Sequence, residues 1–166
     1  MKRRDVLAIG AALAATPALA AEQPVSAAAA VAEAMKNKDL RPYRSQIEGA
    51  MACLDLFMKG FNAKDADLYN QAFNFPSVRL ASNRLRLINK ADQTSALFEN
   101  LEKTGWDHSA WRRRRVFQAG PDKVHIDTNF ARYRKDGTIL GGYDSVYVVN
   151  LEDGHWGVKI RSSFAP

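Results

Sequence analysis

The fold is constrained most strongly by residues 109–164, which read SAWRRRRVFQAGPDKVHIDTNFARYRKDGTILGGYDSVYVVNLEDGHWGVKIRSSF. Three clusters of turn-forming residues divide this stretch: Gly120-Pro121-Asp122, Lys135-Asp136-Gly137 and Glu152-Asp153-Gly154. The segments between them predict four consecutive strands joined as a meander, over residues 109–119, 123–134, 139–151 and 155–164. Within the third strand, Gly141-Gly142 predicts a bulge that bends the sheet.

Helical patterns dominate the region before the meander. Apolar residues recur three and four positions apart along one predicted helix: Ile47, Met51, Leu54, Met58 and Phe61. A second, short helix is expected from Asp65, its N-cap, through Phe73, until Pro76 stops it. A hairpin is predicted over residues 78–88, and a third helix over residues 89–105.

This order of elements, together with several short motifs, resembles the NTF2-like superfamily, close to its SnoaL-like branch. The motifs are PSVRL at 76–80, GWDHS at 105–109, KVH at 123–125, RYR at 132–134, DGHW at 153–156 and RSSF at 161–164. The resemblance covers about residues 47–165. It implies an α+β cone in which three helices pack on a strongly curved mixed or antiparallel sheet and leave an internal pocket.

The same resemblance implies that the other face of the sheet often forms a homodimer. Relatives use the pocket as ketosteroid isomerase, epoxide hydrolase, dehydratase or polyketide cyclase, and others have no catalysis, so the fold does not settle the activity. In the narrower group a histidine is expected after the Phe-Pro pair, where this chain has Ser77. This departure weakens any acid-base role at the end of the first strand.

The first 21 residues read as a signal peptide. Lys2, Arg3 and Arg4 precede a short apolar run, and Ala18-Leu19-Ala20 offers a cleavage site. The arginine pair followed by an apolar pair resembles a twin-arginine signal, and an ordinary secretory signal is the alternative. Either route predicts a periplasmic or secreted protein without a permanent membrane anchor, because the apolar run is about half the ~20 residues that span a bilayer.

The mature chain is then expected to contain an Ala-rich tether or loose helix over residues 22–44 and the NTF2-like domain over residues 45–166. Its charge falls from +6 to +4 when residues 1–21 leave. Neither this charge nor the pattern of basic and aromatic residues indicates a nucleic-acid partner.

Cofactor chemistry has no recognisable motif in the chain. No His or carboxylate spacing resembles a metal site, and no Gly-rich loop leads from a strand into a helix, so no cofactor is predicted. Cys53 is the only cysteine, which excludes an internal disulfide. It lies among apolar helical residues, where a buried, unreactive thiol is expected.

Candidate catalytic residues lie in the second and third strands of the meander. Strand alternation places His125, Asp127 and Asn129 on one face, and a His-Asp pair in a cavity can transfer protons. Asp144 and Tyr147 on the next strand add a second carboxylate and a hydrogen-bond donor, with Tyr143 nearby. A satisfied polar row on an open or dimeric face is the alternative for all of these residues.

Candidate ligand-binding residues include Trp106, His108 and Trp111 at the junction of the third helix and the meander, where aromatic rings can grip a flat ligand. The same rings can instead plug the base of the helix. Residues 112–115 are four consecutive arginines, of which two must face inward or an interface. Ion pairs with Asp127 or Asp144 are favoured over binding of an anionic ligand, and Arg161 has the same two interpretations.

Two functions follow from these patterns. The first is an exported pocket protein that binds a small, partly apolar molecule, with cofactor-free proton transfer by Asp127, His125, Asp144 and Tyr147 left open. The second is a non-enzymatic dimeric module whose cavity is filled by its own side chains. The size of the cavity and the direction of the polar row on the second strand distinguish them.

Overall fold

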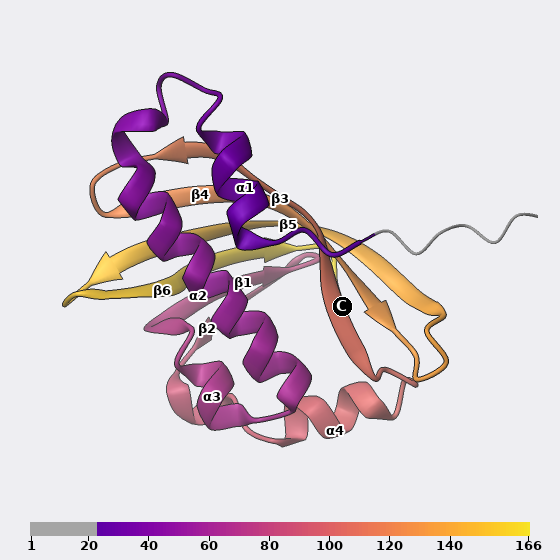
Figure 1. The fold of residues 1–166 in the computed structure, drawn as a ribbon. Helices are drawn as coiled ribbons and strands as arrows, with labels where there is room; N and C mark the ends of the chain where they lie inside the picture. Colours follow the sequence, from indigo (N-terminus) through magenta and orange to yellow (C-terminus); the bar gives the residue numbers. More distant parts are fainter. Residues whose placement is uncertain (1–22) are drawn as a thin grey trace, which may run out of the picture.

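Figure 1 shows a computed structural model, which describes residues 23–166 as one curved sheet with helices on one of its faces. The predicted signal peptide, residues 1–21, lies outside the described residues. The six strands run in the order β2-β1-β6-β5-β4-β3, and only the β1–β6 pair is parallel. Their bounds are β1 Phe73–Ala81, β2 Arg84–Ile88, β3 His108–Ala119, β4 Lys123–Tyr133, β5 Ile139–Glu152 and β6 His155–Ser163.

The last four strands form the predicted meander, with bounds within one residue of the predicted ones. Register irregularities bend it at several points, including β3 between Trp111 and Arg113. In β5, Leu140 is the extra residue opposite β4, next to Gly141, where the sequence predicts a bulge. Because bulges increase the local bend and twist of a sheet, they help the meander curve around the helices.

Helix α2, Arg44–Ala63, crosses the concave face of the sheet and carries the predicted apolar stripe. Ile47, Met51 and Leu54 on this stripe are fully buried. Phe57, which lies next to this stripe on the helix surface, is at the centre of the core. Its ring contacts Tyr69 of α3, Ala66–Asn70, and the rings of Phe73 and Tyr147 in the sheet. The helix ends at Lys64, which adopts the left-handed conformation.

Two predicted helices are shorter than expected. Helix α3 stops at Asn70, and Phe73 instead begins β1, so the prediction that the helix reaches Pro76 is wrong. Strand β1 tolerates Pro76 because its regular pairing with β6 is interrupted between Phe73 and Val78, where no ladder hydrogen bond is needed.

The predicted third helix is also divided. A 3₁₀ turn, Lys90–Asp92, comes first, and α4, Ala96–Glu102, follows after a short extended segment. Asn89 and Asp92 form a capping box that closes the turn on itself. Gly105, at a φ of +86°, lies three residues beyond the end of α4.

The predicted tether contains a packed helix, α1, Ala27–Ala34. Its Ala30, Val31 and Ala34 are buried against α2 and β3, and the backbone of Val25 bonds to Trp111 of β3 (2.9 Å). A 3₁₀ turn, Arg41–Tyr43, links α1 to α2. Within residues 23–166 no helix combines the length and apolar character that crossing a membrane requires.

Candidate functional site

A pocket of about 460 Å³ lies between the helices and the inner face of the sheet. Its walls come from α2, α3, α4 and strands of the sheet, and exposed residues of β2, together with Pro166, form its rim. This volume is within the range of ~300–1,000 Å³ typical of small-molecule sites. The apolar and aromatic lining residues are Phe57, Met58, Phe61, Tyr69, Leu87, Ile88, Leu97, Leu101, Phe130, Tyr147, Ala165 and Pro166.

The deep wall of the pocket is built from rings that hold one another in place. The Phe57 ring lies 4.9 Å from that of Tyr69 and 5.5 Å from that of Tyr147, both edge to face. Phe61 packs 5.5 Å from Tyr69 in turn. Such contacts fix the ring positions and leave a preformed apolar surface.

Four arginines line the pocket; Arg86 of β2 is exposed at the rim, and the other three give the inner wall a positive charge. Arg79 of β1 and Arg161 of β6 are direct neighbours across the parallel strand pair, and Arg132 of β4 lines the same cavity. Arg132 is buried, with only 7% of its surface exposed, and the other two are partly buried. Burial, with the nearby charge of Arg161, lowers the pKa of Arg79 to about 10, and burial also lowers the pKa of Arg132.

None of the three forms an ion pair with an Asp or Glu side chain within residues 23–166. The Arg79 guanidinium donates from Nη2 to the Pro166 oxygen (3.1 Å), while Arg132 lies over the Tyr143 ring (5.0 Å). Arg161 lies 5.7 Å and 5.9 Å from the ring centres of Phe57 and Tyr147. Arg132 and Arg161 are therefore stacked on rings without an Asp or Glu partner, whereas Arg79 is bonded to the main-chain oxygen of Pro166.

Several polar atoms beside these groups lack any hydrogen-bond partner. They are Nε of Arg79, Nε of Arg132 and the hydroxyl of Tyr147, all of them buried. The Tyr147 hydroxyl makes no well-formed hydrogen bond, although Arg161 is close enough to act on it electrostatically, and burial raises the pKa of this phenol. Buried groups of this kind are unusual unless a ligand or ordered water completes them.

Most of the predicted catalytic residues lie on the other side of the sheet. His125, Asp127 and Asn129 share one face of β4, as predicted, but that face points away from the helices, and Asp144 of β5 joins them there. Of the two interpretations of this polar row, the structure has the one in which it lies on the open outer face and not in the cavity, because the more apolar set on β4, including Val124, Ile126, Thr128 and Phe130, takes the inner face.

The outer polar row is an ion-pair cluster. Arg113 donates to Asp127 (2.9 Å) and Asp144 (2.7 Å), and Arg115 reaches Asp127 (3.0 Å). Asn129 donates to Asp144 (2.9 Å). Ion pairing of the arginine run with Asp127 and Asp144, which the sequence favours, is confirmed.

One member of the arginine run faces inward. The Arg114 side chain is 1% exposed, pairs with Asp55 of α2 (2.5 Å) and donates to the Val25 carbonyl (2.5 Å). The bulge after Trp111 shifts the alternation, so that Arg113 and Arg115 both point outward. The sequence predicts that two of the four arginines face each side of the sheet. In the structure Arg114 faces inward, and the bulge turns Arg113 and Arg115 to the outer face.

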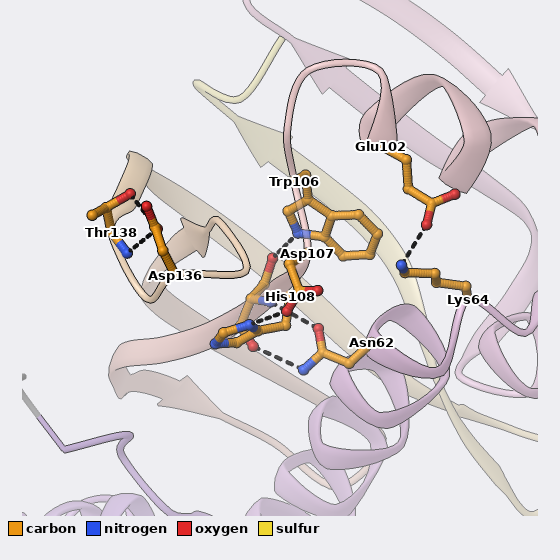
Figure 2. A network of polar contacts seen from close by, with 9 residues as sticks. Asn62, Lys64, Glu102, Trp106, Asp107, His108, Asp136 and Thr138 are labelled. Carbon is orange, nitrogen blue, oxygen red and sulfur yellow. Dashed lines mark hydrogen bonds and ion pairs between the residues drawn. The ribbon is translucent and has the colours of Figure 1, made fainter.

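Trp106 and His108 follow α4 in the chain and lie within a network of polar contacts near its end (Figure 2). Neither residue lines the pocket. The Trp106 indole donates to the Ser109 hydroxyl (2.9 Å) and packs 5.0 Å from Phe61. His108 contacts the neighbouring Asp107 carboxylate (2.8 Å) and stacks on Tyr133. The Asn62 side chain of α2 donates to the Ser109 carbonyl (2.8 Å) and accepts from the Ser109 N–H (2.8 Å). These two hydrogen bonds anchor the start of β3 to α2 (Figure 2).

Trp111 is a core residue, 4% exposed, and lies against Phe57, Phe130 and Tyr147. For Trp106 and Trp111, the structural alternative to ligand binding therefore holds. Tyr143 does not line the cavity either, but its ring supports Arg132. Among the predicted site residues, only Tyr147 and Arg161 line the pocket.

Sequence reasoning missed Arg79, Arg132 and Tyr69. Strand alternation offers a signal for Arg132, because it shares its face with Phe130 and Thr128 on the apolar side of β4. No equivalent signal exists for Arg79, whose neighbours in β1 alternate less clearly. A set of at least three histidines, cysteines or carboxylates placed to hold a metal is absent from residues 23–166.

Comparisons with known proteins agree on the fold. A family model described as NTF2-like protein (DUF6841) matches residues 48–163. An NTF2-like protein of unknown function from Shewanella oneidensis MR-1 superposes with a TM-score of 0.56 at 14% identity, over 68% of this chain and 93% of that one. No curated protein matches the sequence significantly.

Two further solved structures are similar. A protein of unknown function with a cystatin-like fold, from Nostoc punctiforme PCC 73102, gives a TM-score of 0.58 at 13% identity, over 69% of this chain and 86% of that one. A ketosteroid isomerase-like protein from Erwinia carotovora atroseptica SCRI1043 gives a TM-score of 0.53 at 16% identity, over 78% of this chain and 99% of that one. At these identities the likeness concerns the fold alone.

Proposed function

Because the chain belongs to the NTF2-like family DUF6841, we propose that it binds a small, partly apolar molecule in the pocket of its cone. The observation that carries the proposal is the pocket itself, about 460 Å³ in volume and lined by a preformed aromatic wall. A cavity of this size speaks against the alternative in which the protein's own side chains fill the interior. Related folds include a ketosteroid isomerase-like protein, which is consistent with a ligand-binding pocket.

We propose binding alone, without proton transfer by His125, Asp127 or Asp144. His125, Asp127 and Asp144 lie on the outer face of the sheet, so a ligand in the pocket cannot reach them. Among residues 23–166, Asp92 is the only Asp or Glu whose side chain lines the pocket; it is exposed at the rim and accepts hydrogen bonds from Asn89. Within the described part of the chain, no His, Asp or Glu on the inner wall could therefore serve as a general base.

The test uses an uncharged apolar probe, N-phenyl-1-naphthylamine, whose fluorescence rises in an apolar site. We expect saturable binding to the wild-type protein. Leu97 of α4 lines the pocket and is partly buried, so Leu97→Trp would fill part of the space. It should raise the apparent Kd by about tenfold or more.

The matched control is Leu151→Trp, near the end of β5 and outside the pocket. It should bind the probe as the wild type does. Melting temperatures within about 5 °C of the wild type would show that both variants are folded. If the wild type does not bind the probe, or if Leu97→Trp and Leu151→Trp bind it equally well, the proposal is wrong.

A second candidate is homodimerisation through the outer face of the sheet, and this can coexist with ligand binding. The observation that favours it is a strip of exposed apolar side chains on that face. Leu85, Ile160, Val146 and Leu80 have exposed fractions of 73%, 42%, 38% and 37%.

We also propose that the protein is exported, on the strength of the N-terminal sequence. Replacing Arg3-Arg4 with Lys-Lys should stop export if the twin-arginine route is used. The measurement is the distribution of the protein between periplasm and cytoplasm. Unchanged export of the Lys-Lys variant would leave the ordinary secretory route, and a wild-type protein retained in the cytoplasm would contradict export altogether.

A further inference from the structure

The three arginines of the pocket's inner wall differ in their partners from the other inward or paired arginines of the same chain. Arg113 and Arg115 each pair with a carboxylate, and buried Arg114 pairs with Asp55. Arg79, Arg132 and Arg161 line the cavity without an Asp or Glu partner among residues 23–166, although Arg79 donates to the main-chain oxygen of Pro166. Burying a charge without a partner of opposite charge lowers the stability of the fold. A single Asp or Glu in the pocket would remove this free-energy penalty.

The placement of the arginines concentrates their charge. Arg79 and Arg161 are directly opposite in the β1–β6 pair, where like charges destabilise a sheet. Arg132 approaches from β4 and is held in place by the Tyr143 ring. Rings of Phe57 and Tyr147 support Arg161 in the same way. Stacking therefore holds the guanidinium groups of Arg132 and Arg161, and the unpartnered Nε atoms of Arg79 and Arg132 remain available to the pocket.

We infer that the ligand of this pocket carries an anionic group, a carboxylate or a phosphate, which is bound by Arg79, Arg132 and Arg161 while the aromatic wall holds its apolar part. This inference rests on the proposed function and adds the chemical class of the ligand. Guanidinium groups bind both anions through paired, charge-assisted hydrogen bonds. The unpartnered Nε atoms of Arg79 and Arg132 and the Tyr147 hydroxyl are donors that such a group can use.

The test compares probes that share one apolar body and differ in charge. They are 2-naphthoate, 2-naphthyl phosphate, the uncharged 2-naphthalenemethanol and the cation 2-naphthylmethylammonium, titrated by calorimetry at neutral pH and an ionic strength of about 0.15 M. We expect one or both anions to bind at least about tenfold more tightly than the alcohol. The cation should bind most weakly, and the ranking of naphthoate and naphthyl phosphate identifies the anionic group.

Arg132→Met and Arg161→Met should reduce the preference for the anion over the alcohol by about tenfold each, with binding of the alcohol retained. The matched control is Arg84→Met on β2, which removes the same charge outside the pocket. Arg84→Met should keep the full preference.

A purely structural role for the arginines predicts a different result for the proteins without ligand. If Arg132 stabilises the fold, Arg132→Met should lower the melting temperature. If Arg132 instead binds an anionic ligand, then in the ligand-free protein the removal of its charge should leave the melting temperature unchanged or raise it by a few degrees. Arg132→Lys provides a second variant, which keeps the charge and should retain part of the preference if the methionine variant does not fold.

The outcomes separate this inference from the proposed function. Binding of the alcohol as tightly as the anions would overturn the anionic class while the pocket proposal stands. Binding of none of the four probes, together with no binding of N-phenyl-1-naphthylamine, would overturn both. If Arg84→Met lost the preference for anions as strongly as Arg132→Met does, the assignment of anion binding to these side chains would also be contradicted.

Discussion

Arg113 holds two carboxylates of neighbouring strands at the same time. Hydrogen bonds from Asn129 and Arg113 lower the pKa of Asp144, whose side chain is 59% exposed. A carboxylate with a lowered pKa stabilises the fold above its ordinary pKa of 3.8, and this contribution is lost as the pH falls through the lower, folded-state value. Exposure to solvent keeps the contribution small.

We therefore predict that Asp144→Asn lowers the free energy of unfolding by about 0.5 kcal/mol at neutral pH, and at most about 1 kcal/mol. The difference from the wild type should disappear well below pH 3.8. Urea denaturation at the two pH values measures it. Asp122→Asn, in the turn before β4, is the control, and a difference that persists in acid would contradict the electrostatic origin.

Cys53 is an unreactive thiol because of where α2 places it. The residue is 4% exposed, its Sγ donates to the Ala72 carbonyl (3.4 Å), and burial raises its pKa to about 12. At pH 8 almost none of it is thiolate, the reactive form. We predict no reaction with Ellman's reagent in the native protein and one thiol per chain in urea; rapid labelling of the folded protein would contradict this burial.

At the level of elements, α1 is part of the core although its sequence offers few large apolar side chains. Its alanines let the helix approach α2 and β3 closely, and Val31 is 7% exposed. We predict that Val31→Asp lowers the free energy of unfolding by roughly 2 to 4 kcal/mol, because it buries an unpaired carboxylate. The exposed neighbour Ala32→Asp is the matched control for denaturation experiments, and equal effects of the two would mean that α1 is not docked in solution.

The elements also show what sequence patterns can and cannot determine. Turn residues and strand length predicted the four-strand meander with its bounds, and the apolar spacing predicted α2. Alternation also predicted which residues of β4 share a face. It did not determine which face turns inward, because His125, Asp127 and Asn129 suit a polar cavity as well as an outer ion-pair cluster, and the packing of α2 decides between them.

The candidate site was harder to predict than the fold for a related reason. Its arginines come from β1, β4 and β6, and only the parallel pairing of β1 with β6 brings Arg79 beside Arg161. This pairing joins strands about 80 residues apart and leaves no local pattern. Tyr147 and Arg161 were recognised because the meander that carries them was itself recognisable.

The whole molecule has one sheet with two contrasting faces. Helices cover the inner face (Figure 1). The pocket lies between this face and the helices, with residues of α2 and α4 in its lining. The outer face has no helix on it among the described residues, and it combines the ion-pair cluster with exposed apolar residues of β1, β2, β5 and β6. Ligand binding and subunit association can therefore use opposite faces without interfering with each other.

The last prediction concerns association through this outer face. Ile160 pairs with Val148 on one side and Val78 on the other, so the apolar strip is continuous across three strands. In a two-fold dimer the same strip meets its own copy, and a single Ile160→Asp substitution places two carboxylates in the interface. We expect the wild type to sediment as a dimer at micromolar concentration and Ile160→Asp to weaken dimerisation by roughly a hundredfold or more.

Leu151→Asp, outside the strip, should remain dimeric, and because the pocket lies on the other face, monomeric Ile160→Asp should still bind N-phenyl-1-naphthylamine. A wild type that is monomeric throughout this range would contradict association, while loss of probe binding in the monomer would contradict the independence of the two faces.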